Sequence, residues 1–402
     1  MQRIIAILLF LFLFSGTSLL WGQTLTISES GQNGTSGTNW SIRQDTLLVN
    51  GEANIQPAVL ENALSIGDLY VKVIGGQSSV VLNATISSDS KSNLRIEASQ
   101  EIIINNCLEI ASGTLWLTVQ DQGKASGKIT INNTVSVSNL EGQGGDIYME
   151  AKSILLSDKA NLQAQGRTGG GNILVGGDWQ GGASEENRVF EDPKTLLQAT
   201  KVTMDPKAFI DTSATENGNG GTVVLWSDIH DITSVTKAQG TIFAKGGSIS
   251  GDGGKIETSG FELLIQGIKV KTDSPNGASG IWLLDPYDYV INSSEASTIS
   301  NALTGGTTVT VSTGTSNSSY GSSGSNLDSG SIYVNAAISG SGSGNLSLEA
   351  GKFIYFNADV STTGNQSYSG RVFVKKSNLS LSTNGGNITF SNDIYGLTGS
   401  ES

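Results

Sequence analysis

A short pattern of glycine and alternating apolar residues recurs along this chain. It reads Gly, any residue, apolar, any residue, apolar. We interpret each copy as a turn residue that tolerates positive φ, followed by a short strand with alternate side chains on one face. Short strands that recur at a spacing of one coil are typical of a β-solenoid. The eleven copies begin at Gly67, Gly113, Gly127, Gly145, Gly171, Gly221, Gly280, Gly330, Gly344, Gly370 and Gly386.

Between successive copies the alternation predicts further strands. The copy at 145–149 is followed by Ile154-Leu-Leu156 and then by the alternating run 160–164. This order predicts three short strands per coil. We therefore expect an all-β fold, a β-solenoid, over most of the chain.

The regularity of the pattern divides the chain into four zones. Residues 1–22 are a signal peptide, and residues 23–126 are β-rich but irregular. Residues 127–291 carry the densest repeats. Residues 292–402 carry further solenoid repeats after a Ser/Gly/Thr-rich tract, 304–331, which we expect to be a long loop.

One segment, near 183–200, interrupts the pattern. Ser184 to Leu197 is charged, contains a proline and lacks alternation, which predicts a loop or a short helical excursion from one coil. Excursions on the side of a solenoid can hold binding residues, but we favour the role of a solvated spacer here.

Composition and charge fit an elongated β protein. The chain has 402 residues, 52 glycines and only five prolines, and a solenoid of this length needs no single compact core. The formal net charge of −13 disfavours nucleic acid and anionic membranes as partners.

The N-terminus predicts export. A short positive start precedes the unbroken apolar run Ile4 to Phe14, and small residues follow as far as Gly22. This run of 11 residues is shorter than the roughly 20 that a membrane-spanning helix needs. We expect a secreted or cell-surface protein with no integral membrane span after the signal is cleaved.

The candidates for chemistry are few. Cys107 is the only cysteine, which we expect to be a small buried residue on a strand, and His230 is the only histidine. A nucleophilic triad would have to combine His230 with Ser227 or Cys107, and a polar turn at 228–231 is the simpler interpretation. The pair Asp285 and Asp288, after the buried apolar strand 281–284, could act as acid and base on a sugar, but spacing alone is weak evidence.

Two glycine-rich segments have a similar structural interpretation. Residues 246–254 partly match a calcium-binding nonapeptide but occur once, without tandem copies. Asp178, Trp179 and Gln180 lie between glycine pairs and predict a turn with a stacked aromatic ring. We therefore predict no catalytic, cofactor-binding or metal site, and no cofactor.

Four ordered blocks resemble the filamentous haemagglutinin family, the large exoproteins of bacterial two-partner secretion. The resemblance implies a right-handed parallel β-helix and export through a partner outer-membrane pore. It covers the central repeats and includes no recognisable secretion domain. Because the repeat is still running at 386–390, we also expect the chain to be part of a longer exoprotein. The blocks are Gly169 to Gly181, Gly218 to Asp228, Ala244 to Gly260, and Gly280 to Asp288.

The resemblance favours a non-catalytic adhesin or stalk that attaches to cells or surfaces through a receptor or glycan that the sequence does not name. The alternative is a secreted polysaccharide-degrading enzyme on a pectate-lyase-like β-helix. That class of enzyme needs a groove lined by Asp, Lys and Arg, and the sequence shows no such cluster. We therefore expect a protein that is not an enzyme.

Overall fold

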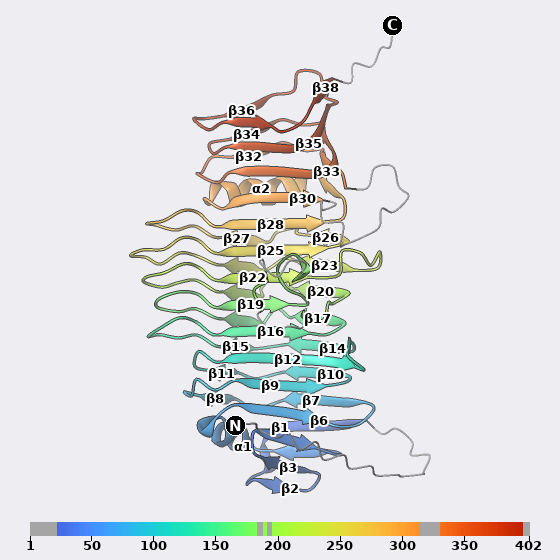
Figure 1. Cartoon of the computed structure of the whole chain (residues 1–402), viewed down its shortest axis with the longest axis vertical. Coiled ribbons are helices and arrows are strands. Elements are labelled where there is room, and N and C mark those ends of the chain that lie inside the picture. Colours follow the sequence, from blue (N-terminus) through green and yellow to red (C-terminus); the bar gives the residue numbers. More distant parts are fainter. Residues whose placement is uncertain (1–21, 183–187, 191–194, 314–329, 397–402) are drawn as a thin grey trace, which may run out of the picture.

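The computed structural model describes residues 22–182, 188–190, 195–313 and 330–396. Short strands lie one above another along the long axis of the molecule (Figure 1). Neighbouring strands in the stack pair in parallel, apart from the antiparallel hairpins within residues 36–49 and 114–125. The predicted all-β fold is thus confirmed as a solenoid-like stack of long parallel sheets.

From β7 (Ser78–Leu82) to β28 (Ile281–Pro286), successive strands fall in turn into three sheets, which we name A, C and B. The exception is β13 (Lys124–Ala125), which forms a hairpin with β12 (Thr114–Asp121). For example, β14, β15 and β16 each pair in parallel with the strand three places later, β17, β18 and β19. This order confirms the three strands per coil. The pairing of β10 with β14 crosses residue 126, where the sequence predicts a zone boundary.

The strands of sheets A and C are as follows. Sheet A contains β5 (Ala53–Ile55), β1 (Gln23–Gln32), β7 (Ser78–Leu82), β10 (Glu101–Ile104), β14 (Lys128–Ile131), β17 (Ser153–Leu156), β20 (Lys201–Met204), β23 (Val235–Ala238) and β26 (Glu262–Leu264). Sheet C contains β8 (Ile86–Ser88), β11 (Leu108–Ile110), β15 (Thr134–Ser136), β18 (Asn161–Gln163), β21 (Phe209–Asp211), β24 (Thr241–Phe243) and β27 (Lys269–Lys271).

Sheet B runs the length of the stack. Its earlier strands are β2 (Ser36–Gly37), β3 (Trp40–Arg43), β4 (Thr46–Val49), β6 (Leu69–Val73), β9 (Leu94–Ala98), β12 (Thr114–Asp121), β13 (Lys124–Ala125), β16 (Asp146–Glu150), β19 (Asn172–Val175), β22 (Thr222–Trp226), β25 (Lys255–Gly260) and β28 (Ile281–Pro286). Its later strands are β29 (Tyr289–Ile291), β30 (Thr308–Thr313), β31 (Ile332–Val334), β33 (Leu346–Phe356), β35 (Gln366–Val374), β37 (Ile388–Phe390) and β38 (Ile394–Gly396). A small sheet holds β32 (Ile338–Gly340), β34 (Val360–Thr362) and β36 (Leu381–Thr383).

The alternation of the repeat determines which side chains enter the core. In β12 the apolar positions Leu115 and Leu117 are fully buried, and Trp116 between them is only partly buried on the outer face. The apolar positions of the copies at 145–149 and 171–175 are likewise buried. One continuous apolar core therefore fills the stack, while the intervening positions of sheet B form its outer face.

The glycines of the repeat have a different role from the one that the sequence suggested. A Cβ atom on Gly171 would lie 1.8 Å from the carbonyl oxygen of Gly145, and one on Gly221 would lie 1.8 Å from the carbonyl oxygen of Gly171. These distances are shorter than any real contact, so only glycine fits. The tolerance of glycine for positive φ, which the sequence suggested as its role, is used by few of the copies. Among the eleven, a φ in the left-handed range occurs only at Gly127, Gly330 and Gly370.

The glycines at which the backbones of adjacent coils approach this closely form a row that we call the glycine column. At several steps the residue after the glycine donates its backbone N–H to the glycine carbonyl one coil earlier, as Lys255 does to Gly221 at 3.0 Å and Ile281 does to Gly254 at 3.0 Å. Asn172 instead donates its backbone N–H to the Asp146 carboxylate. The column therefore lets the strands of sheet B begin in register. It comprises Gly113, Gly145, Gly171, Gly221, Gly254 and Gly280, and Gly344, Gly364 and Gly386 continue it.

Two helices were not predicted. The helix α1 (Pro57–Ile66) begins at a proline, and α2 (Ser293–Thr304) begins with a capping box between Asn292 and Glu295. Apolar residues of both helices are buried, including Leu303, which packs against Gly340. Both helices are short, and α2 is rich in Ser, Thr and Asn, so its sequence resembles the surrounding polar turns.

The predicted loop at 304–331 is partly wrong, because residues 308–313 form β30, which pairs with both β28 and β33. Residues 314–329 of that tract lie outside the described residues, as does the predicted signal peptide except for Gly22. No helix in the described part of the chain is long and apolar enough to cross a membrane.

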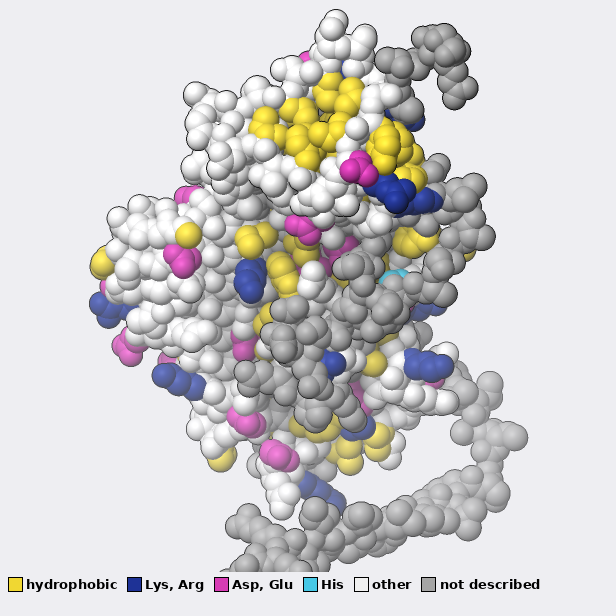
Figure 2. All heavy atoms as spheres, turned by 45° about the horizontal axis from the view of Figure 1, so that its top comes forward, with side chains coloured by type: hydrophobic (Ala, Val, Ile, Leu, Met, Phe, Trp, Pro, Cys, Tyr) yellow, Lys and Arg dark blue, Asp and Glu magenta, His cyan; other side chains and the backbone are white. Residues whose placement is uncertain are grey.

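Hydrophobic side chains gather at the end of the stack that the last strands form (Figure 2). In this region four aromatic rings stack from strand to strand on sheet B, with ring centroids 4.8 to 5.4 Å apart. They belong to Tyr333, Tyr355, Phe373 and Tyr395.

We predict that Gly171→Ala destabilises the protein by about 2 to 3 kcal/mol, because the added methyl group forces adjacent coils apart. Thermal or denaturant unfolding measures the effect. Gly67→Ala is the matched control, since Gly67 begins another copy of the repeat but has no atom within 4 Å of the added Cβ. Equal stability of the two variants would contradict this role for the glycine column.

Candidate functional site

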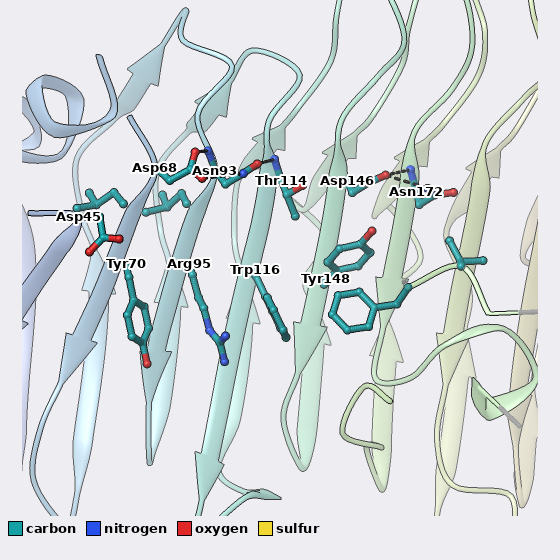
Figure 3. Close-up of a pocket in the computed structure, with 14 residues that line it drawn as sticks. Asp45, Asp68, Tyr70, Asn93, Arg95, Thr114, Trp116, Asp146, Tyr148 and Asn172 are labelled. Carbon is teal, nitrogen blue, oxygen red and sulfur yellow. Dashed lines mark hydrogen bonds between the residues drawn. The ribbon is translucent and has the colours of Figure 1, made fainter. Parts of the chain in front are cut away.

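The outer face of sheet B carries a groove of about 600 Å³ that crosses successive strands near the N-terminal end of the stack (Figure 3). Two rows of side chains line it, one at the start of the strands and one two residues further along. Because the strands are parallel and in register, each strand contributes equivalent positions to both rows. We call this feature the sheet B groove.

The row two residues further along each strand contains aromatic side chains and one arginine, and we call it the aromatic row. Tyr70 pairs with Arg95 across β6 and β9, Arg95 with Trp116 across β9 and β12, and Trp116 with Tyr148 across β12 and β16. The guanidinium of Arg95 lies between two rings, 4.0 Å from the Trp116 centroid and 5.4 Å from the Tyr70 centroid. Such cation–π contacts hold the arginine upright in the row.

The polar row consists of short side chains that bond from strand to strand. Asn93 donates from its backbone and its amide to the carboxylate of Asp68, at 2.8 and 3.1 Å. Asn172 donates in the same way to Asp146, with both distances 2.9 Å. The row is therefore fixed in position before any ligand binds. The row is Asp68, Asn93, Thr114, Asp146 and Asn172. Asp45, which is one position out of this register, also lines the groove.

Two buried carboxylates hold the polar ends of the aromatic row. Glu97 accepts hydrogen bonds from the Tyr70 hydroxyl at 2.5 Å and the Gln120 amide at 3.2 Å, and its carboxylate lies 2.9 Å from Lys72 Nζ. Burial alone would raise the pKa of Glu97, but the hydrogen bonds from Tyr70 and Lys72 outweigh it, so the pKa lies below its usual value. Glu97 is therefore ionised and holds Tyr70 in place.

Glu150 holds Trp116 in the way that Glu97 holds Tyr70. It accepts a hydrogen bond from the Trp116 indole nitrogen at 2.6 Å and another from the Thr118 hydroxyl at 3.0 Å. The backbone N–H of Leu197 donates to its second oxygen at 2.7 Å. Glu150 thus joins the aromatic row to the excursion between β19 and β20.

That excursion covers sheet B beside the groove. Its residues Phe190 and Leu196 bury Trp226, Val224 and Leu174 in a second hydrophobic cluster outside the main core. The prediction of a solvated spacer is therefore wrong for the described residues, which pack on the sheet. Val189 and Phe190 also form one end of the groove.

The base of the excursion is the predicted turn at Asp178, Trp179 and Gln180. Asp178 is almost completely buried and accepts three backbone N–H groups, from Trp179 at 2.7 Å, Val189 at 3.0 Å and Phe190 at 3.1 Å. The turn is confirmed, with positive φ at Gln180. The aspartate therefore fixes the excursion to its base.

Beneath the excursion two further acids are buried in sheet B. Glu257 is fully buried and accepts hydrogen bonds from the Gln180 N–H and the Ser259 hydroxyl. Burial raises the pKa of Glu257 well above its ordinary value, and the charges of Asp285 and Asp178 raise it further. Burial, with a contribution from Glu349, raises the pKa of Asp285 to about 7.

The predicted acid pair Asp285 and Asp288 lies in two different environments. Asp285 is buried, whereas Asp288 accepts the backbone N–H groups of Gly330 and Ser331 at 2.7 and 3.0 Å. Asp288 therefore anchors the backbone before β31 (Ile332–Val334). In the strand before them, Ile281 is partly exposed rather than buried.

The other candidates have structural roles. The Ser227 hydroxyl is fully buried and bonds to the hydroxyls of Thr236 and Ser234. Cys107 lies just before β11 rather than on a strand, is only partly buried, and donates to the Asn133 side chain at 3.5 Å. The segment 246–254 is the turn between β24 and β25, in which Asp252 accepts the N–H of Ala278 from the next coil.

The residues of the sheet B groove were not predicted from the sequence as a candidate site. Tyr70, Trp116 and Tyr148 occupy the fourth position of their repeat copies, and Asp68 and Asp146 occupy the second. Both positions accept any residue in the pattern that predicts the fold. Comparing these positions between copies would have shown the aromatic and acidic residues that the structure aligns.

No family model matches the chain, and no curated protein sequence matches it significantly.

We predict that Asp285→Asn stabilises the protein at pH 8 by up to about 4 kcal/mol and has little effect at pH 4. The folded-state pKa of about 7 lies above the ordinary value of 3.8, so the folded protein binds the proton more tightly than the unfolded chain. The stability of the wild type therefore falls as the pH rises from about 4 to 7 through this group.

Denaturant unfolding of both proteins across this pH range measures the difference between them. Asp393→Asn, on an exposed turn near the end of the stack, is the control and should show no such difference. A constant difference between wild type and Asp285→Asn at all pH values would contradict the raised pKa.

Proposed function

We propose that this chain is an exported, non-catalytic adhesin or stalk protein of the filamentous haemagglutinin type. In this proposal the strands wind as a right-handed parallel β-helix, and the protein reaches the cell surface or medium after its signal peptide is removed. A partner outer-membrane pore would export it. The sheet B groove would attach it to a cell or surface.

The observation that carries the proposal is the preorganised sheet B groove. Its aromatic rings and carboxylates are fixed by hydrogen bonds within the protein, so binding loses little side-chain entropy. Most of its lining residues come from strands of the continuous stack, which is a rigid support compared with isolated loops. Such a groove is suited to holding a ligand in place.

The stack itself also supports the role of a stalk. Each coil adds about 4.8 Å of length, and each contacts only its neighbours. An elongated body of this kind keeps a binding groove away from the surface that carries the protein. The four sequence blocks that resemble haemagglutinins lie in the middle of this body.

We predict that beads coated with the exported chain adhere to cells or to polysaccharide-coated surfaces, and that the chain releases no reducing sugar from polysaccharides. Adhesion counts and a reducing-sugar assay measure the two results. Beads coated with the chain after thermal unfolding are the control, because they carry the same residues without the groove.

Two results would contradict the proposal. Equal adhesion of folded and unfolded chain would show that attachment does not depend on the structure. Cleavage of a polyuronide in the presence of calcium would instead favour the enzyme alternative.

A further inference from the structure

We propose that the sheet B groove binds a neutral oligosaccharide, lying across the strands from β6 towards β16. The inference rests on the proposed attachment function and names the chemical class of its ligand. A sugar ring presents an apolar C–H face and a rim of hydroxyl groups. The groove offers a surface complementary to each.

The aromatic row supplies the apolar surface. The polar ends of Tyr70 and Trp116 already bond to Glu97 and Glu150, so what the two side chains can offer a ligand is mainly ring carbon. Both side chains are only partly buried, which leaves part of each ring accessible from the groove. Aromatic rings held in this way suit the C–H face of a sugar.

The polar row supplies hydrogen-bonding groups at the same strand spacing. Carboxylates of Asp68 and Asp146 accept hydrogen bonds from hydroxyl groups, and the amides of Asn93 and Asn172 can both donate and accept. A hydroxyl group is itself donor and acceptor, so an alternation of acidic and amide side chains matches a row of hydroxyls. Neighbouring strands are about 4.8 Å apart, close to the length of one pyranose unit in a β-1,4-linked chain.

The charge of the groove excludes acidic sugars. Its lining contains three aspartates and one cationic side chain, Arg95, and the guanidinium of Arg95 lies 3.6 Å from the Glu97 carboxylate. A uronate or a sulfated sugar would meet net negative charge here. A cationic peptide would also suit the charge of the groove, so it is included in the test as the competing ligand.

Isothermal titration of the exported chain tests the proposal. The probes are hexasaccharides of β-1,4-linked glucose, mannose and xylose, together with hexagalacturonate and hexalysine. We expect at least one neutral hexasaccharide to bind with a Kd below about 1 mM, and neither charged probe to bind as tightly.

Variants locate the binding site. Tyr70→Ala should weaken binding of that hexasaccharide roughly tenfold, whereas Tyr70→Phe keeps the ring and should bind within about twofold of wild type. Asp68→Ala, which removes an acceptor from the polar row, should weaken binding roughly fivefold. Tyr333→Ala is the matched control, because Tyr333 is an aromatic residue on the outer face of the same sheet but outside the groove, and binding should be unchanged.

Several results would overturn the proposal. Binding of hexalysine alone would assign the groove to a cationic peptide, and preferred binding of hexagalacturonate would refute the charge argument. If no probe bound, or if Tyr70→Ala and Tyr333→Ala lost the same amount of affinity, the groove would not be the binding site. Adhesion of coated beads without oligosaccharide binding would refute this inference alone, whereas oligosaccharide binding without adhesion would refute the attachment function.

Discussion

The structure depends on how closely the backbones of adjacent coils approach at the start of the strands of sheet B. At the glycine column, the carbonyl oxygen of one coil occupies the space where a side chain of the next would begin. The resulting N–H to carbonyl bonds, such as that of Lys255 to Gly221, set the register of the parallel strands. Register in turn determines which side chains enter the core and which face solvent, because side chains alternate along a strand.

Register also explains why the outer face of sheet B has continuous rows of side chains. Equivalent positions of successive coils lie side by side, so Tyr70, Arg95, Trp116 and Tyr148 become neighbours although 78 positions separate the first from the last. Carboxylates in the adjoining row, Glu97 and Glu150, then satisfy the polar ends of these side chains. The groove is therefore a consequence of stacking, with the excursion forming one end.

The excursion shows how the same face can be closed as well as open. Where Phe190 and Leu196 cover sheet B, the outer positions are apolar or are acids whose ionisation is suppressed, such as Glu257. Beyond the excursion, the carboxylates and half-buried rings of the groove remain accessible. The outer face of sheet B therefore has a covered region, which holds the excursion, and an open region, which is available to a ligand.

The residue pattern by itself predicted the strand content, a solenoid and three strands per coil, because side-chain alternation acts within a few residues and the repeat spacing within one coil. It did not determine the reason for the glycines, the helices α1 and α2, or the packing of the excursion. Gly171 has no room for a side chain because the carbonyl oxygen of Gly145, one coil earlier, lies against it. Asp178 can be buried because the backbone N–H groups of Val189 and Phe190 donate to its carboxylate. The groove was likewise decided by the tertiary structure, because its residues occupy the repeat positions that the folding pattern leaves unconstrained, and only register brings them together.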